Sequence, residues 1–214
     1  MNFRCSLSQH LTVLLGASLV VVLMAGTSYA GPRSGFSVYG SYVNRSTQLS
    51  QRVATTNGGN FSEATLSTTQ ASSGGGLGLD YQFATGKWFS IVPFYQYSSE
   101  SNKGGDGSVD LDNGSTVTIT GTTSTVVHHF AGSQFRFWPG DNFYFGPEIG
   151  YHSETFSGGG SNVTGTGIGG GLVIGFETDG GFQIFVQIDT MTADHGDNIT
   201  NGGTATRLNA GYRF

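Results

Sequence analysis

The sequence predicts an all-β fold, an eight-stranded antiparallel up-and-down transmembrane β-barrel. Apolar and polar residues alternate with a period of two along most of the chain after residue 30, which is typical of strands whose two faces meet different surroundings. The connections between these segments alternate between short turns and long polar loops. Short turns at one end and long loops at the other are the layout of a barrel that spans a membrane.

The alternation is clearest over residues 143–151, where mainly apolar side chains take one face and glycine, glutamate and tyrosine take the other. The other predicted strands are 36–42, 77–83, 89–97, 127–137, 168–176, 182–189 and 204–214. Short turns lie around Gly86, Gly140 and Gly180, and long Ser/Thr/Gly/Asn-rich loops span 45–70, 99–120, 154–164 and 192–203. Three short and four long connections make the seven that eight antiparallel strands require.

Residues 1–30 have the organisation of a cleaved secretory signal peptide. Arg4 precedes an apolar run over 11–25, which is shorter than the roughly 20 residues of a spanning helix. A small-x-small cleavage site follows at 28–30. The predicted mature domain is therefore 31–214, and it has no thiol because the only cysteine, Cys5, lies in the signal.

The composition excludes several classes of protein. Glycine makes up 36 of 214 residues, about two and a half times its usual share of roughly 7%, but there is no collagen-like G-X-Y period. The 16 Phe and 9 Tyr disfavour a disordered chain. The predicted mature domain carries 9 − 1 = 8 basic and 14 acidic residues, a formal charge of −6 that disfavours a nucleic-acid partner.

One phenylalanine lies at the turn end of every predicted strand. This set is a predicted periplasmic aromatic girdle: Phe36, Phe83, Phe89, Phe137, Phe143, Phe176, Phe182 and Phe214. The alternative, core phenylalanines of a soluble β-sandwich, gives no reason for one at every strand end.

The phenylalanines that flank each turn are six residues apart, which predicts the register. If each pair is opposed, the loops hold an odd number of residues, most simply three, in a type I turn followed by a left-handed glycine. A two-residue Asp179-Gly180 turn is excluded because it would exchange the two faces of a strand. Gly78 should then oppose Phe94, and Gly175 should oppose Gln183, so that small residues face large ones in a filled lumen.

Several ionisable residues fall on the inward face, where they can pair with one another. The predicted interior polar network is Asp80, Arg136, Glu148, Glu177, Asp189, Arg207 and Arg213. These groups indicate either a selective polar pathway or a salt-bridged core that blocks the lumen. The blocked lumen is favoured, because side chains of this size fill the interior of an eight-stranded barrel.

The chain end completes a resemblance to a known family. The ending at 208–214, with Tyr212 and Phe214 as its aromatic residues, together with the signal peptide and the strand pattern, resembles the small outer-membrane barrels of Gram-negative bacteria, the OmpA/OmpX and opacity-protein group. The resemblance implies export by the Sec route to the cell outer membrane. It also implies contacts with outer-membrane lipids and lipopolysaccharide, and recognition of Tyr212 and Phe214 by the barrel assembly machinery.

Candidates for chemistry are few. The predicted register opposes His128 to His152 on the inner face, with Glu154 nearby, which is a weak candidate for a divalent metal site or a proton switch. Polar residues lining the barrel mouth are the favoured interpretation, so no metal and no cofactor are expected. Some barrels of this group modify lipid A with His, Ser and an acidic residue, but Ser153 should point away from His152 and Glu154. His129, which points outward, has no recognisable partner.

The two strand prolines predict local defects. Pro93 and Pro147 lack the N–H that a ladder requires, so a bulge or a missing bond is expected at each.

The predicted function is that of a monomeric integral outer-membrane barrel with a largely filled polar interior. Its four surface loops would serve structural, adhesion or ligand-interaction roles. The alternatives are a narrow porin-like channel for small solutes and a lipid A-modifying enzyme, and the chain is expected not to be an enzyme.

Overall fold

The computed structural model describes residues 32–57, 60–111, 114–121, 123–158, 161–195 and 199–214. The predicted signal peptide, 1–30, lies outside the described residues. Within these ranges no helix is long and apolar enough to cross a bilayer. The strands are β1 (Gly35–Asn57), β2 (Asn60–Ala84), β3 (Phe89–Lys103), β4 (Gly107–Asp110), β5 (Thr116–Ile119), β6 (Thr123–Phe137), β7 (Phe143–Gly158), β8 (Ser161–Glu177), β9 (Phe182–Asp194) and β10 (Ile199–Arg213).

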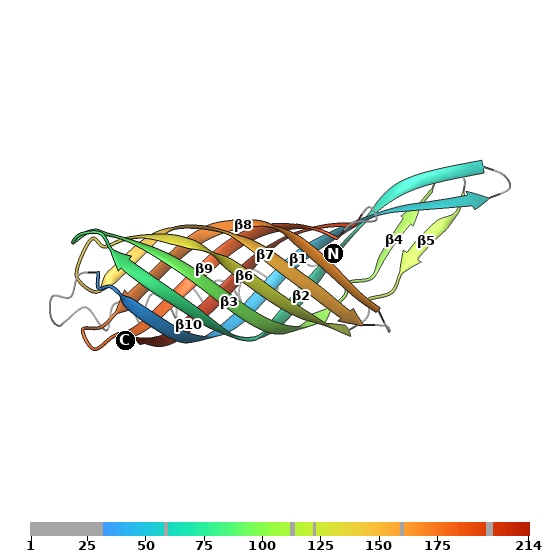
Figure 1. Ribbon diagram of the computed structural model, residues 1–214. Helices are drawn as coiled ribbons and strands as arrows, with labels where there is room; N and C mark the ends of the chain where they lie inside the picture. Colours follow the sequence, from blue (N-terminus) through green and yellow to red (C-terminus); the bar gives the residue numbers. More distant parts are fainter. Residues whose placement is uncertain (1–31, 58–59, 112–113, 122, 159–160, 196–198) are drawn as a thin grey trace, which may run out of the picture.

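Eight of these strands close into one barrel, in the order β1-β10-β9-β8-β7-β6-β3-β2. Every neighbouring pair is antiparallel, and β1 pairs with both β2 and β10, so the sheet has no open edge around the barrel. Figure 1 shows the strands running obliquely to the barrel axis. The predicted fold class is confirmed. β4 and β5 form a separate two-stranded sheet.

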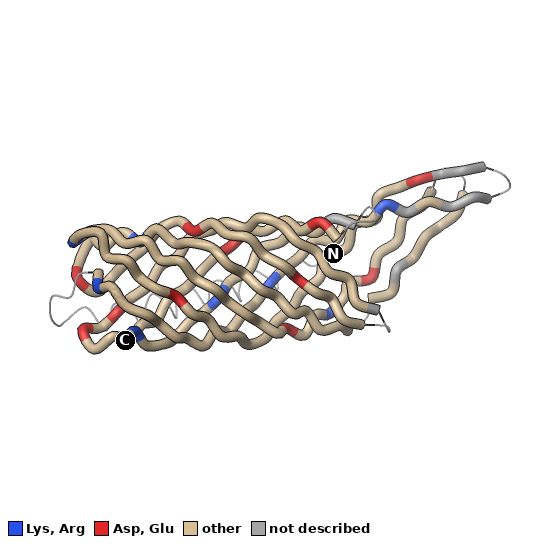
Figure 2. The backbone as a smooth tube through the Cα atoms, viewed as in Figure 1, with Lys and Arg blue, Asp and Glu red and all other residues tan. Residues whose placement is uncertain are grey.

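The two faces of the barrel are the reverse of those of a soluble protein. Inward side chains are mostly polar and buried, whereas large apolar side chains such as Leu77, Ile168 and Leu172 are 58–66% exposed on the outside. β3 shows the alternation without a break, with every second side chain buried from Ser90 to Asn102. Charged residues are sparse along the backbone tube in Figure 2. An apolar exterior around a polar interior is suited to lipid rather than to water.

The strands are longer than predicted, and the long loops are correspondingly shorter. β1 and β2 stay paired from Gly35↔Gln82 to Asn57↔Asn60, so most of the predicted loop 45–70 is a hairpin that projects beyond the barrel in Figure 1. The predicted loops 154–164 and 192–203 also give way to strand, since β7 ends at Gly158 and β8 begins at Ser161. Outward residues above the apolar band are mostly polar, with many Ser and Thr, so the alternation of hydrophobicity disappears while the backbone ladder continues.

The predicted loop 99–120 contains the β4–β5 hairpin, which the sequence analysis did not foresee. This hairpin contacts β2, where Leu66 and Thr68 are buried, and Leu111 beside it is 5% exposed. A Cβ built on Gly107 would lie 2.5 Å from Thr68 Cγ2, so the hairpin and β2 approach closely. The two hairpins thus form a small satellite cluster at the loop end of the barrel.

The third short turn has the predicted type but not the predicted position. Thr178 N donates to Phe182 O at 2.8 Å, which leaves a three-residue loop, and Gly181 closes it with φ of 91°. The rejection of a two-residue turn is thereby confirmed. Phe176, however, pairs with Ile184 and not with Phe182, because the loop is centred on Gly180 and not on Asp179. Moving the centre by one residue moves every partner by two and leaves the faces unchanged.

The same displacement occurs at the other two short turns. Phe83 pairs with Ile91 instead of Phe89, and Phe137 pairs with Phe145 instead of Phe143. Among the described glycines only Gly114 and Gly181 have positive φ, so the predicted left-handed glycine is found at the third turn alone. The inward and outward assignments remain correct, because a shift of two residues preserves parity.

Both strand prolines interrupt a ladder without changing its register. Beside Pro93, the β2–β3 ladder contains the pairs Asp80↔Phe94 and Phe83↔Ile91 but lacks the two pairs between them. The residue numbers of both pairs add up to 174, so the register is the same on either side of the gap. Beside Pro147, the β6–β7 ladder also lacks two pairs. The residue numbers of the pairs on either side of this gap both add up to 282, so the register is again unchanged. Missing bonds, and no bulge, are therefore the outcome of the two predicted alternatives.

Small inward residues do face large ones on neighbouring strands, but the large residues are not those that the predicted register paired with them. Gly78 opposes Gln96 on β3, not Phe94, and lies under the ring of Tyr39 on β1. A Cβ on Gly78 would lie 2.0 Å from Tyr39 Cε2. Gly175 opposes Phe185 rather than Gln183, and a Cβ there would lie 2.4 Å from Tyr144 Cζ. These inward glycines therefore make room for the aromatic side chains that fill the lumen.

Candidate functional site

The candidate site is the lumen itself, where ten charged side chains of the described residues are buried. All seven residues of the predicted interior network are at most 5% exposed, and three further residues, Arg45, Glu100 and Glu154, join them. Each of the four arginines contacts at least one carboxylate: Arg45, Arg136, Arg207 and Arg213. Pairing is what allows charges to be buried at all, because an isolated buried ion is strongly destabilising.

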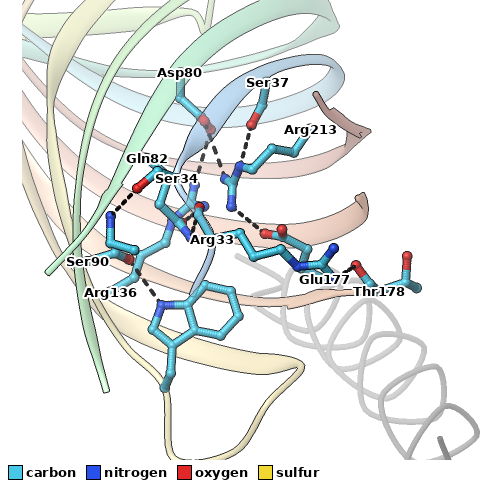
Figure 3. A network of polar contacts seen from close by, with 12 residues as sticks. Arg33, Ser34, Ser37, Asp80, Gln82, Ser90, Arg136, Glu177, Thr178 and Arg213 are labelled. Atoms are coloured by element: carbon cyan, nitrogen blue, oxygen red, sulfur yellow. Dashed lines mark hydrogen bonds and ion pairs between the residues drawn. The ribbon is translucent and has the colours of Figure 1, made fainter. Parts of the chain in front are cut away.

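A first network closes the turn end of the lumen (Figure 3). Asp80 accepts from Arg136 at 3.3 Å and from Arg213 at 3.5 Å, so one carboxylate joins arginines of β6 and β10. Arg213 also donates to Glu177 on β8, and its Nε donates to Ser37 Oγ at 3.0 Å. Strands β1, β2, β6, β8 and β10 are therefore tied together across this end of the barrel.

Arg136 is the most enclosed group of this end. Its Nη1 donates to Gln82 Oε1 at 3.2 Å, and its Nη2 donates to Gln134 Oε1 at 2.7 Å. The guanidinium carbon lies 4.4 Å from the centroid of the Tyr144 ring, within the range of a cation–π contact. Arg136 is 0% exposed, so no part of this cation reaches water.

The middle of the lumen is occupied by neutral amides and by Arg207. Gln187 accepts from Gln96 at 2.6 Å and donates to Glu148 Oε2 at 2.8 Å. Gln96 also donates to the Tyr39 hydroxyl at 3.1 Å. Arg207 forms an ion pair with Asp189 and lies against the ring of Phe130, 5.5 Å from its centroid.

A second network closes the loop end, and Arg45 is its centre. Arg45 donates to Glu100 Oε1 at 2.8 Å and to Glu154 Oε2 at 3.0 Å. Ser72 and Ser98 complete the hydrogen bonds of Glu100, at 2.6 and 2.8 Å. The other oxygen of Glu154 accepts from Asn201 at 2.6 Å and lies 3.1 Å from His195 Nε2. Sequence reasoning missed this network because it assigned these positions to loops or to loop boundaries.

Two of these contacts span the full width of the barrel. In the ring of eight strands, β1 and β7 are separated by three strands in either direction, and so are β3 and β9. Arg45–Glu154 joins the first pair and Gln96–Gln187 joins the second. Diametrically opposed side chains thus meet at two levels of the described lumen, as the narrow interior of an eight-stranded barrel allows.

The structure changes the partners of the predicted histidine and glutamate candidates. His128 opposes Glu154 in the ladder and His152 opposes Phe130, so the predicted His128–His152 register pair is wrong by the same two residues. The two imidazole rings nonetheless lie 5.4 Å apart, and His152 Nε2 contacts Thr192 O at 2.9 Å. Across the described residues, no three His, Cys, Asp or Glu side chains are placed to share a metal ion.

The outward histidine has partners that the sequence did not reveal. His129 Nδ1 lies 2.7 Å from the Tyr95 hydroxyl, and its ring is 5.4 Å from that of Tyr97. Ser153 pairs with His129 across the outer face, whereas His152 and Glu154 are buried inside. The His152, Ser153 and Glu154 side chains are therefore divided between two faces, as the alternation requires.

The eight phenylalanines of the predicted girdle all lie on the outward parity near the turn end. Phe36, Phe83, Phe137, Phe182 and Phe214 are 41–75% exposed, and Phe89 and Phe143 are partly exposed. Phe176 differs, being only 8% exposed. The rings of Phe89 and Phe137 lie 5.2 Å apart, so the girdle is a set of contacting rings over part of its circumference.

Comparison with known structures identifies the architecture. The outer-membrane protein OprG of Pseudomonas aeruginosa aligns with a TM-score of 0.53 at 12% identity, over 86% of this chain and 98% of that one. This chain has the fold of the small outer-membrane β-barrels. Ail of Yersinia pestis, in complex with a heparin analogue, aligns at 0.47 with 14% identity over 85% and 100% of the two chains. The outer-membrane protease OmpT of Escherichia coli aligns at 0.43 with 11% identity, over 89% and 99%.

Sequence comparison adds nothing to this fold assignment. No protein-family model matches the chain, and no curated protein matches it significantly. The specific properties of this barrel must therefore be inferred from the residues of its own lumen, outer face and hairpins.

Proposed function

We propose that the chain is an integral β-barrel protein of the Gram-negative outer membrane that acts as a non-conducting anchor for its surface hairpins. The observation that carries the proposal is the pair of contacts that cross the lumen, Arg45–Glu154 and Gln96–Gln187. A water-filled path would have to break the buried, charge-assisted bond between Arg45 and Glu154, a kind of bond that is about twice as strong as a neutral one, and the buried neutral amide bond between Gln96 and Gln187. The lumen therefore serves as the core of the protein.

The outer surface supports the membrane location. Its exposed apolar side chains would be unfavourable in water but are favourable against lipid tails, and the phenylalanine girdle suits the periplasmic interface. In this orientation the short turns face the periplasm, and the β1–β2 and β4–β5 hairpins face outward. Surrounding lipids and lipopolysaccharide would be its immediate partners, in a monomeric state.

Biogenesis follows the same proposal. Residues 1–30 would direct export by the Sec route. Tyr212 and Phe214 lie outward at the end of the last strand, 45% and 75% exposed, where the barrel assembly machinery could bind them before closure. The hairpins would then provide the structural, adhesive or ligand-binding surface.

A liposome-swelling assay tests the anchor against the alternative of a solute channel. Vesicles that contain the folded protein should swell in an isosmotic small sugar no faster than empty vesicles, because the two crossing contacts block the lumen. Heat-dependent gel mobility confirms that the reconstituted protein is folded. Swelling that rises with the amount of folded protein would support the channel and refute the anchor.

A further inference from the structure

A shallow, open groove of about 510 Å³ lies at the loop end of the barrel wall. Its volume falls in the range of small-molecule sites, roughly 300–1,000 Å³. The residues that line it are Ser46, Gln48, Thr69, Thr190, Met191, Thr192, Gly202, Gly203 and Thr204. Except for Met191, whose side chain is buried, the side chains of this groove lie on the outer face of the barrel.

The strand register explains how the groove forms. One row of paired residues runs from Thr192 on β9 through Gly202 on β10 and Gln48 on β1 to Thr69 on β2. Gly202 contributes no side chain to this row, so a gap remains between Thr192 and Gln48. Below it, Thr190, Thr204 and Ser46 form a second row of hydroxyls.

The chemistry of the groove is uncharged and rich in hydrogen-bonding groups. Hydroxyls and an amide both donate and accept, which matches the hydroxyls of a sugar. Of these side chains only Thr190 makes a hydrogen bond within the described part of the chain, to Gly170 O at 3.2 Å. None of the residues that line the groove is charged, so a phosphate would meet no Lys or Arg side chain there.

The apolar belt of the barrel is lower on the side that carries the groove. From the girdle upward, the outward apolar positions extend over seven residues on β1, β2, β9 and β10 (36–42, 77–83, 182–188, 208–214). On β3, β7 and β8, across the barrel, they extend over nine residues (89–97, 143–151, 168–176), whereas on β6 Ser133 interrupts them above Phe135. Two residues correspond to about 7 Å along a strand and about 5 Å along the membrane normal.

This asymmetry places the groove at a defined depth. Thr190 is the next outward residue after Ile188, and Ser46 comes four residues after Tyr42, the last apolar residue of the belt on β1. At 3.4 Å per residue and a tilt near 45°, the groove extends from roughly 5 Å above the upper edge of the belt at Thr190 to roughly 20 Å at Thr69. The groove therefore begins within the headgroup region, which is about 5–8 Å thick in each leaflet, and continues into the space above it that sugars attached to the headgroups would occupy.

We propose that this groove binds the uncharged sugar headgroup of a glycolipid of the outer leaflet. The acyl chains would lie on the lowered apolar belt of β9, β10, β1 and β2, and the sugar hydroxyls would bond to the two rows of Thr, Ser and Gln side chains. The inference rests on the proposed membrane location, since only a bilayer brings a headgroup to this depth.

Native mass spectrometry of the folded protein, released from micelles doped with defined lipids, tests this site. The probes are a diglucosyl diacylglycerol, a phosphatidylglycerol and a diacylglycerol with the same acyl chains. The glycolipid should be retained about tenfold better than either other lipid, as the gain of two or three hydrogen bonds implies. Equal retention of the three lipids would overturn the proposal.

Two glycine variants locate the binding. Gly202→Gln fills the gap, and its Cβ would meet nothing closer than Met191 O at 4.0 Å, so folding should be preserved. Gly75→Gln is the matched control, because Gly75 is an exposed glycine of β2 outside the groove whose Cβ would lie 3.8 Å from Ser41 O. We expect Gly202→Gln alone to lose the glycolipid preference. Loss in both variants, or in neither, would contradict the assigned groove.

A competition arm separates a glycolipid from a free sugar. An equimolar free disaccharide should not displace the glycolipid, and equal displacement would overturn the membrane source. Heat-dependent gel mobility and the β spectrum are recorded first for each protein. A failure to fold into micelles would count against the proposed function, whereas a folded protein without glycolipid preference would count only against this inference.

Discussion

Arg136→Met should lower the free energy of unfolding by about 3–5 kcal/mol, the usual result of removing one partner of a buried ion pair. The substitution leaves Asp80 with Arg213 alone, at 3.5 Å, and it removes the donors that satisfy Gln82 and Gln134. Because Arg136 is fully buried, water cannot replace the lost contacts. Denaturant unfolding from phospholipid vesicles, followed to equilibrium, measures the change.

Lys87→Met is the matched control for this experiment. Lys87 is exposed in the first short turn, and its loss should change the free energy of unfolding by no more than about 0.5 kcal/mol. If Arg136→Met costs as little as the control, then Asp80 is reached by water and the turn end of the lumen is open.

Gly78→Ala should destabilise the barrel by about 1–3 kcal/mol, although it adds only one methyl group. The new Cβ would lie 2.0 Å from Tyr39 Cε2, and Tyr39 cannot move away freely. Its ring packs edge-on against Phe185 at 5.0 Å, and its hydroxyl accepts from Gln96. The same unfolding assay in vesicles measures the loss.

The neighbouring strand offers the opposite result at another glycine. A Cβ on Gly40, which points outward, would meet nothing within 4 Å, so Gly40→Ala should be neutral or stabilising by roughly 0.5–1 kcal/mol.

Combining Gly78→Ala with Tyr39→Ala should cost less than the sum of the two single changes, because the methyl group then occupies space that the ring has left. Additive losses would show that Gly78 and Tyr39 do not compete for space.

The fold was predictable from sequence because parity alone assigns the two faces of a strand. Alternation places Arg136 and Asp80 inside and Phe137 outside whatever the pairing, so the eight-stranded barrel and its inward charges follow from local pattern. The register was not predictable to within two residues. The third turn is centred on Gly180 and not on Asp179, and parity is insensitive to that difference.

The loop-end network was missed for a different reason. Above the apolar belt, outward positions such as Ser46 and Gln48 are as polar as the inward Arg45 and Thr47, so the period that marks a strand is lost. Only the backbone ladder shows that β1 continues, and with it that Arg45 reaches Glu154 on the opposite wall. The contact between those two residues depends on barrel closure, which no local window of sequence contains.

The groove on β9, β10, β1 and β2 was unpredictable for a related reason. Thr192 and Gly202 come from the β9–β10 hairpin, whereas Gln48 and Thr69 come from the β1–β2 hairpin at the other end of the sequence, and only the closure of β1 on β10 aligns them in one row. Gly202 in isolation is one loop-proximal glycine among many.

Single-channel recording in planar bilayers tests the closed lumen most directly. The folded protein, purified and inserted in concentrated potassium chloride, should give no steady unitary conductance, because Arg45–Glu154 and Gln96–Gln187 cross the barrel at two levels. Insertion is verified independently by protease digestion of the exposed hairpins. Steady, reproducible conductance steps from the inserted wild-type protein would contradict the closed lumen and establish a pore.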